Sequence, residues 1–199
     1  MAAPSGWASE LFFVVVYNNA MIEARVFTDS LDHAKAVLEK DQAILKGRYV
    51  IDDTIYRNID ASISLTDEFL RLRIIPENIW DGKDVILALK RTKLHDVGKN
   101  SDIPLKLQFD DKDEAEAYYD LHLKGRFIRA FSFSRIGWQY LMQNGDVIDL
   151  EIVEQDFPSI EFKSQTDEGI QKLLSRFSID ERDVITGPSV VTVKDKLNL

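Results

Sequence analysis

Charged residues two positions apart recur along the chain, and their types point to phosphate chemistry. The clearest pair is Arg71 and Arg73 in the segment EFLRLRI (68–74), where leucine and isoleucine take the alternate positions. Because side chains alternate between the two faces of a β-strand, both guanidinium groups would lie on one face. Arginine can bind phosphates in bidentate fashion and lysine as a point charge, so several such groups on rigid strands could bind a chain of phosphates.

Other predicted strands carry charge on one face in the same way. The residues in question are Glu23 with Arg25, Lys90, Lys106 with Gln108, Arg129 with Arg135, Asp149 with Glu151, and Glu161 with Lys163. Carboxylates beside phosphate-binding cations could hold Mg²⁺, which takes oxygen ligands and keeps waters and phosphate oxygens among them. Such a site could stabilise the charge that develops during phosphoryl transfer.

The one-sided charge is compatible with two arrangements. In an open sheet with one wet side, the charged faces are the polar exterior of the protein. In a closed barrel with helices packed outside, the same faces converge inward and form a binding site. Closure requires outer helices, and the sequence predicts three of them.

Composition limits the classes of function. The 199 residues are 45% hydrophobic and 30% charged, which predicts one domain. From the run of predicted elements we expect its core over about 11–178 and a C-terminal extension over 179–199. The chain has no cysteine, which excludes disulfides and thiolate metal sites. A net charge of −9 argues against a DNA coat function. The apolar run 11–17 is too short to span a bilayer and lacks a signal-peptide pattern, so we expect no membrane role and a cytoplasmic location.

Period-two strand patterns dominate, and helical patterns interrupt them. The first half predicts a strand over 18–27, a helix over 28–41 capped by Asp29 or Ser30, and an antiparallel meander over 49–58, 69–75 and 85–93. The second half repeats this order, with a strand and a helix over 104–125 and strands over 126–142, 146–153 and 159–164. The chain would then end in a helix and a strand.

Several local features are also predicted. Ala117, Tyr118 and Leu121 should form the apolar stripe of the second helix. Asn144-Gly145 is suited to a two-residue hairpin turn. The last helix, 166–177, should be capped by Thr166, and a short strand should follow the Gly187-Pro188 break.

Over roughly residues 20–178, these segments resemble, in order, the CYTH or triphosphate tunnel metalloenzyme superfamily. FLRLRI (69–74) is similar to the family's Leu-Arg-x-Arg strand, LALK (87–90) to its Thr-Leu-Lys strand, and FSFSR (131–135) to its Lys-x-Arg strand. IDLEIVEQDFPSIEFKS (148–164) resembles the segment in which an acidic strand, a turn and a Glu-bearing strand follow one another. The resemblance implies an α+β fold, an eight-stranded antiparallel β-barrel that forms a triphosphate tunnel, with about three flanking helices.

The resemblance also implies roles for individual residues. The catalytic carboxylates would be Glu23, Glu151 and Glu161, and these together with Asp149 would bind the metal, Mg²⁺ or Mn²⁺. The triphosphate would be bound by Arg25, Arg71, Arg73, Lys90 and Arg135.

Three positions depart from the family's pattern. Met21 replaces the first acid of Glu-x-Glu-x-Lys, Phe133 replaces the lysine of Lys-x-Arg, and Lys163 replaces the second acid of Glu-x-Glu. With these acids missing, a two-metal arrangement is not expected, whereas a single metal could remain.

Three classes of function follow from this sequence. The first is metal-dependent binding and turnover of a nucleoside triphosphate or another triphosphate inside a basic tunnel. Turnover would be hydrolysis, as in a triphosphatase (a phosphoanhydride hydrolase), or ATP cyclisation, as in a class IV adenylate cyclase. The second is a tunnel that binds a phosphorylated ligand without turnover. The third is an unrelated α+β interaction module. The expected partner is a triphosphate-containing small molecule, and a homodimer is compatible with the sequence.

Overall fold

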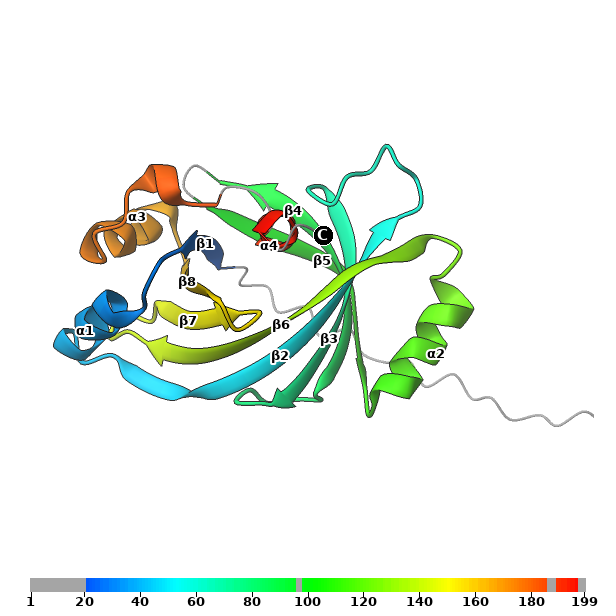
Figure 1. The fold of residues 1–199 in the computed structure, drawn as a ribbon, viewed down its shortest axis with the longest axis horizontal. Helices are drawn as coiled ribbons and strands as arrows, with labels where there is room; N and C mark the ends of the chain where they lie inside the picture. Colours follow the sequence, from blue (N-terminus) through cyan, green and yellow to red (C-terminus); the bar gives the residue numbers. More distant parts are fainter. Residues whose placement is uncertain (1–20, 96–97, 186–188, 197–199) are drawn as a thin grey trace, which may run out of the picture.

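The computed structural model describes residues 21–95, 98–185 and 189–196, so the apolar run 11–17 and the Gly187-Pro188 break lie outside the described residues. The elements (Figure 1) are β1 (Ile22–Phe27), α1 (Asp32–Lys40), β2 (Ile44–Asn58), β3 (Glu68–Glu77), β4 (Val85–Leu94), β5 (Lys99–Phe109), α2 (Lys112–His122), β6 (Phe127–Leu141), β7 (Val147–Val153), β8 (Phe157–Ser164), α3 (Asp167–Arg176), η1 (Glu181–Asp183) and α4 (Ser189–Lys196). None of the helices in these ranges is long and apolar enough to cross a membrane.

The eight strands form a closed barrel in the order β1-β5-β4-β3-β2-β6-β7-β8, with β8 pairing back to β1. Every neighbouring pair is antiparallel. The β1–β8 pairing runs from Ile22 to Phe27, whereas β1 and β5 pair only at Glu23 and Lys99. The predicted eight-stranded antiparallel barrel is therefore confirmed, with a thin seam between β1 and β5.

The flanking helices cover two apolar clusters on the outside of the barrel wall. α1 and α3 cover outward side chains of β1, β7 and β8, including Ala24 and Phe162. α2 covers outward side chains of β2 to β6, including Leu70 and Leu72. Figure 1 shows α2 at the opposite end of the molecule from α1 and α3.

These outer clusters decide between the two arrangements that the sequence allowed. Ala24 of β1 and Leu72 of β3 are buried under helices, with exposed fractions of 0% and 2%. Because alternate side chains lie on opposite faces, the neighbouring residues Arg25, Arg71 and Arg73 face the barrel interior. The charged faces are therefore the lining of a barrel and not the wet side of an open sheet.

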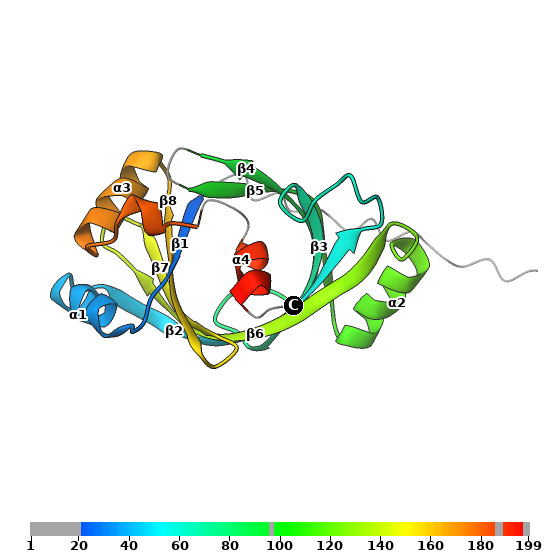
Figure 2. The same ribbon diagram turned by 45° about the horizontal axis from the view of Figure 1, so that its top comes forward.

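α4 occupies a different position from the other helices, and Figure 2 shows it within the outline of the barrel. Val190 and Val193 pack with Phe69, Phe131 and Phe133 in one buried cluster. α4 therefore closes one end of the interior with apolar contacts. The predicted strand in this segment is wrong, because packing of the valines at positions i and i+3 against the interior phenylalanines outweighs the strand preference of β-branched residues.

Predictions at the ends of elements were partly right. Thr166 caps α3 as predicted, and its side chain accepts a hydrogen bond from the N–H of Gly169 at 3.0 Å. α1 begins later than predicted, at Asp32, and has no side-chain cap. Ser30 Oγ accepts a hydrogen bond from the N–H of Asp32 at 3.1 Å, so it supports the approach to the helix and is not its N-cap.

The predicted apolar stripe of α2 is right for Tyr118 and wrong for Ala117 and Leu121. Ala115 is the fully buried residue of the helix, Ala117 is exposed, and Leu121 is 77% exposed. The helix is rotated because Tyr119 packs against Tyr56 of β2, with ring centroids 4.4 Å apart, and Tyr118 against Phe109 of β5, at 5.6 Å. The aromatic contacts therefore set which face meets the barrel.

The turn at Asn144-Gly145 is present, but it belongs to a three-residue loop and not to the predicted two-residue loop. The N–H of Met142 donates to the carbonyl of Asp146 at 2.9 Å and closes the loop. Gly145 has a φ of 89°, the left-handed conformation that three-residue hairpins require at this position.

Candidate functional site

The barrel interior brings together the carboxylates and cations to which the family resemblance gave roles. The prediction that Arg129 shares the face of Arg135 is wrong, because a register shift places Arg129 opposite the outward Tyr56, where it is exposed. The inward cations are Arg25, Arg71, Arg73, Lys90, Lys106, Arg135 and Lys163, and the inward carboxylates are Glu23, Asp53, Asp149, Glu151 and Glu161. Several are withdrawn from water, with Arg25, Asp149 and Glu151 each 1% exposed. Since an unpaired buried charge is costly, the partners of each group determine what the interior can bind.

Arg25 of β1 bridges two carboxylates on the neighbouring part of the wall. Its Nη1 donates to Glu151 and, at 2.9 Å, to Ser159, and its Nη2 donates to Glu161 at 2.7 Å. Burial by itself would lower the pKa of Arg25, but Glu151 and Glu161 outweigh burial and raise it well above its ordinary value. Arg25 is thus neutralised by carboxylates and has little charge left for a phosphate.

Lys163 of β8 lies between two interior carboxylates, Asp149 and Glu161. Its Nζ is 2.5 Å from Oδ2 of Asp149 and 3.0 Å from Oε2 of Glu161. Burial opposes the charge of Lys163, but Asp149 and then Glu161 outweigh burial and raise its pKa above the ordinary value. The ammonium group is therefore fixed and charged at neutral pH.

Three of the four carboxylates predicted to bind a metal do not fit a divalent cation in this arrangement. Asp149, Glu151 and Glu161 are each bonded to Arg25 or Lys163, whereas the side chain of Glu23 forms no hydrogen bond or ion pair with the described residues. Within residues 21–95, 98–185 and 189–196, no group of three or more His, Asp or Glu side chains could hold a metal ion. The metal-binding roles therefore stay predictions.

On the other side of the interior, one carboxylate serves three arginines. Asp53 of β2 accepts two hydrogen bonds from Arg73, from Nε and Nη2, both at 2.8 Å, and one from Nη2 of Arg135 at 3.2 Å. Nε of Arg71 lies 3.7 Å from Oδ1 of the same residue. Burial would raise the pKa of Asp53, but Arg73, Arg71 and Arg135 together lower it, so the carboxylate stays ionised.

Positive charge on this side exceeds the charge that Asp53 supplies. Nε of Arg71 is buried and forms no hydrogen bond with the described residues. Burial, followed by the charge of Arg73, lowers the pKa of Arg71 to about 9, which leaves it charged at neutral pH. Lys90 forms neither an ion pair nor a hydrogen bond within the described part of the chain, and burial, followed by Arg71, lowers its pKa to about 7. These groups form an electropositive half of the interior.

Comparison with known proteins identifies the architecture. No protein-family model matches the sequence, and no curated protein matches it either. Among solved structures, the PH1819 protein from Pyrococcus horikoshii matches with a TM-score of 0.69 and 18% identity, over 88% of this chain and 99% of that chain. The PH1012 protein from the same organism matches with a TM-score of 0.62 and 21% identity, over 83% and 94% of the two chains.

A third structure carries a functional description. HpAC1 from Hippeastrum, described as a candidate adenylyl cyclase with a dominant triphosphatase activity, matches with a TM-score of 0.54 and 16% identity, over 83% of this chain and 90% of that chain. The chain shares the fold of these three structures, which agrees with the resemblance of its sequence to the CYTH superfamily. At these identities the likeness concerns the fold alone, and the activity of HpAC1 is not thereby an activity of this barrel.

Two residues of the barrel that sequence patterns did not nominate, Tyr49 and Gly137, also position the site. The hydroxyl of Tyr49 on β2 donates to Oε1 of Glu151 at 2.6 Å, and the Tyr49 ring packs 4.8 Å from that of Trp80, centroid to centroid. The ring fits because Gly137 of β6 has no side chain: a Cβ there would lie 2.5 Å from Cε2 of Tyr49 and closer still to Cζ and Oη. A glycine inside a strand pattern is the one sequence signal that could have indicated this close approach.

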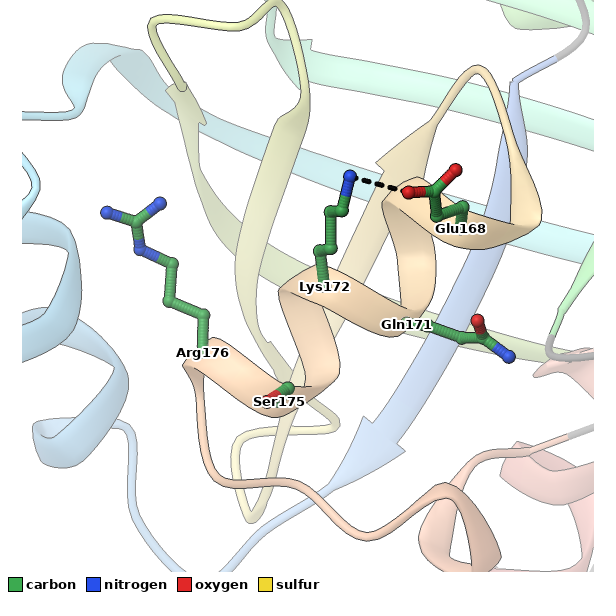
Figure 3. A pocket seen from close by; sticks show the side chains of 5 residues that line it. All are labelled: Glu168, Gln171, Lys172, Ser175 and Arg176. Atoms are coloured by element: carbon green, nitrogen blue, oxygen red, sulfur yellow. Dashed lines mark ion pairs between the residues drawn. The ribbon is translucent and has the colours of Figure 1, made fainter.

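Outside the barrel, α3 lines a surface hollow of about 560 Å³ (Figure 3). Its lining residues are Glu168, Gln171, Lys172, Ser175 and Arg176. Glu168 and Lys172, one turn apart, pair with each other at 2.7 Å and are each 74% exposed. Exposed pairs of this kind stabilise a helix slightly and do not create a binding site, so the hollow is not a second candidate.

Proposed function

We propose that this protein binds a triphosphate-containing small molecule inside the barrel. The observation that supports the proposal is the excess of positive charge on one side of the interior, where Arg71, Arg73 and Arg135 share Asp53 and Lys90 has no carboxylate partner among the residues that the structure describes. Buried like charges repel, and a polyanion placed among them would relieve the repulsion. A phosphate chain has the charge density and the acceptor oxygens that guanidinium groups bind well.

The geometry of the cations supports a chain of phosphates over a single anion. Arg71 and Arg73 lie two residues apart on β3, Lys90 lies on the adjacent β4, and Arg135 lies on β6 across β2. Nε of Arg71 is buried without a hydrogen-bond acceptor among the described residues, so this donor is available to a ligand, whereas Nε of Arg135 lies 3.4 Å from Oε1 of Glu151. The cations are thus distributed along the wall, and several phosphates could be contacted at once.

For turnover of the bound triphosphate, hydrolysis of a phosphoanhydride bond is the reaction to test first and ATP cyclisation is the second. The reason is that HpAC1, a candidate adenylyl cyclase with the same fold, is described as having a dominant triphosphatase activity. The family resemblance predicts that both binding and turnover depend on Mg²⁺ or Mn²⁺, whereas the binding proposed here rests on the arginines and Lys90 and requires no metal.

The proposal is tested by thermal unfolding with tripolyphosphate, ATP, GTP and thiamine triphosphate, with released phosphate and cyclic AMP measured in the same samples. A ligand that binds only the folded state raises the melting temperature according to its concentration over its dissociation constant. We expect a rise for wild type and a smaller rise for Arg71→Gln. No rise with any of the four compounds would refute the proposed function, and the products formed would assign hydrolysis, cyclisation or binding alone.

A further inference from the structure

The carboxylate side of the interior contains its own cation at the point where two acids face each other. Asp149 of β7 and Glu161 of β8 are direct cross-strand neighbours. Like charges opposite each other destabilise a sheet, so a cation is needed between them. Nζ of Lys163 fills this need, at 2.5 Å from Asp149 and 3.0 Å from Glu161.

Protein donors contact every carboxylate oxygen of this cluster. Oδ1 of Asp149 accepts from Gln139 at 3.0 Å and its Oδ2 is bonded to Lys163. Arg25 and Lys163 take the two oxygens of Glu161. Tyr49 and Arg25 take the two oxygens of Glu151.

A divalent cation would have to compete with these donors. Mg²⁺ and Mn²⁺ prefer carboxylate and water oxygens, and each carboxylate here would first have to release an arginine or a lysine into a buried space. Arg25 is 1% exposed and the side chain of Lys163 is 21% exposed, so Lys163 is the more displaceable of the two.

We propose that Lys163 takes the place of a divalent metal in this barrel, so that the interior binds polyphosphate without one. The identity of the ligand rests on the proposed function, whereas the exclusion of metal rests on the carboxylate cluster alone. Removing the ammonium group would free Oδ2 of Asp149 and Oε2 of Glu161, which face the same point. A barrel without Lys163 should therefore acquire a divalent cation site.

The test titrates Mn²⁺, without any triphosphate, into wild type, Lys163→Gln, Lys163→Glu and the control Lys172→Gln, and follows free Mn²⁺ by electron paramagnetic resonance. Lys172 is a lysine on the outer surface, 74% exposed, and its replacement removes the same charge. We expect no binding to wild type and the control at about 1 mM Mn²⁺. Both Lys163 variants should bind Mn²⁺ with a dissociation constant at least about tenfold below that concentration.

Two results would overturn the proposal. The first is Mn²⁺ binding by wild type that disappears in Asp149→Asn. The second is a folded Lys163→Gln variant, as judged by circular dichroism, that gains no Mn²⁺ binding. The first result needs only wild type and Asp149→Asn, so it can decide the question even if both Lys163 variants fail to fold.

A separate titration of wild type with tripolyphosphate, in EDTA and in Mn²⁺ at matched free ligand, distinguishes failure of this inference from failure of the proposed function. We expect affinities that agree within about twofold. Binding only in Mn²⁺ would refute the inference and leave the proposed function standing. Binding in neither would refute the proposed function, while the Mn²⁺ titrations would still decide the role of Lys163.

Discussion

Replacement of Lys90 by methionine should stabilise the ligand-free barrel and weaken its binding of polyphosphate. Lys90 lies on β4 and is influenced by Arg71 and Arg73 of β3, Glu23 of β1 and Glu161 of β8. It has no ion-pair partner among the described residues. Burial, with the repulsion of Arg71 next in size, lowers its pKa from 10.5 to about 7. Lys90 is thus a charge that the empty barrel holds at a cost.

The sign and size of the effect follow from the two pKa values. Between pH 7 and 10.5 the unfolded chain binds more protons at Lys90 than the folded chain, so stability rises with pH across this window. The cost is fully present below pH 7 and disappears as the pH rises toward 10.5. At about 1.36 kcal/mol per pKa unit, the fall to about 7 corresponds to at most about 5 kcal/mol.

The assay is urea unfolding of wild type, Lys90→Met and the control Lys93→Met from about pH 6 to about pH 9. Lys93 is an exposed lysine on the same strand. We expect Lys90→Met to be more stable than wild type at about pH 6, with the difference shrinking by up to about 1.4 kcal/mol per pH unit above neutrality. Lys99 and Arg71 also have lowered pKa values, about 8 and about 9, but both proteins retain them, so the difference isolates Lys90.

Added tripolyphosphate should make wild type more stable than Lys90→Met, because the phosphate chain supplies the counter-charge that Lys90 lacks. The affinity of wild type should then fall by up to about tenfold per pH unit above neutrality, and that of Lys90→Met should change less. A stability difference that does not vary with pH, or a Lys90→Met variant less stable than wild type at acid pH, would refute this reasoning.

Other variants test the remaining contacts. Arg73→Gln should weaken tripolyphosphate binding by roughly 10- to 100-fold. The variant should stay folded because Asp53, the carboxylate partner of Arg73, retains Arg71 and Arg135. An unchanged dissociation constant in calorimetry would contradict this prediction. Gly137→Ala should lower the free energy of unfolding in urea by about 1–3 kcal/mol through its clash with Tyr49. The control Gly125→Ala, whose Cβ meets nothing within 4 Å, should not lower it. Equal losses of stability in the two variants would show that the clash at Gly137 is relieved. Arg25→Met should cost about 3–5 kcal/mol at neutral pH, and less in acid, where the carboxylates it leaves unpaired become protonated; a loss that is the same at every pH would argue against its ion pairs.

Strand alternation was sufficient to predict most of the interior. In EFLRLRI the leucines mark the outer face, so the inward direction of Arg71 and Arg73 follows once the sheet is closed. The same reasoning holds for Glu151 and Glu161. The pattern also separated the chain into two halves of like element order, as the structure has them.

The partners of these residues could not be predicted, because they depend on register between distant strands. Asp52 and Asp53 are adjacent in sequence. Only the pairing of Asp53 with Arg73 and of β2 with β6 determines that Asp53, and not Asp52, contacts the arginines. A register shift in β2 between Val50 and Asp52 lies beside Tyr49, and no sequence pattern marked it. Lys163 stood out as a departure from a family pattern, but its bond to Asp149 requires the pairing of β7 with β8.

Calorimetric titration of tripolyphosphate into wild type and Arg71→Gln tests the central claim most directly. Arg71 has a buried donor without an acceptor, and its replacement leaves the ion pairs of Asp53 with Arg73 and Arg135 in place. We predict saturable binding to wild type and an affinity at least about tenfold lower for the variant, with both proteins folded. Equal affinities, or no binding to wild type, would contradict the claim that the barrel interior is a polyphosphate site.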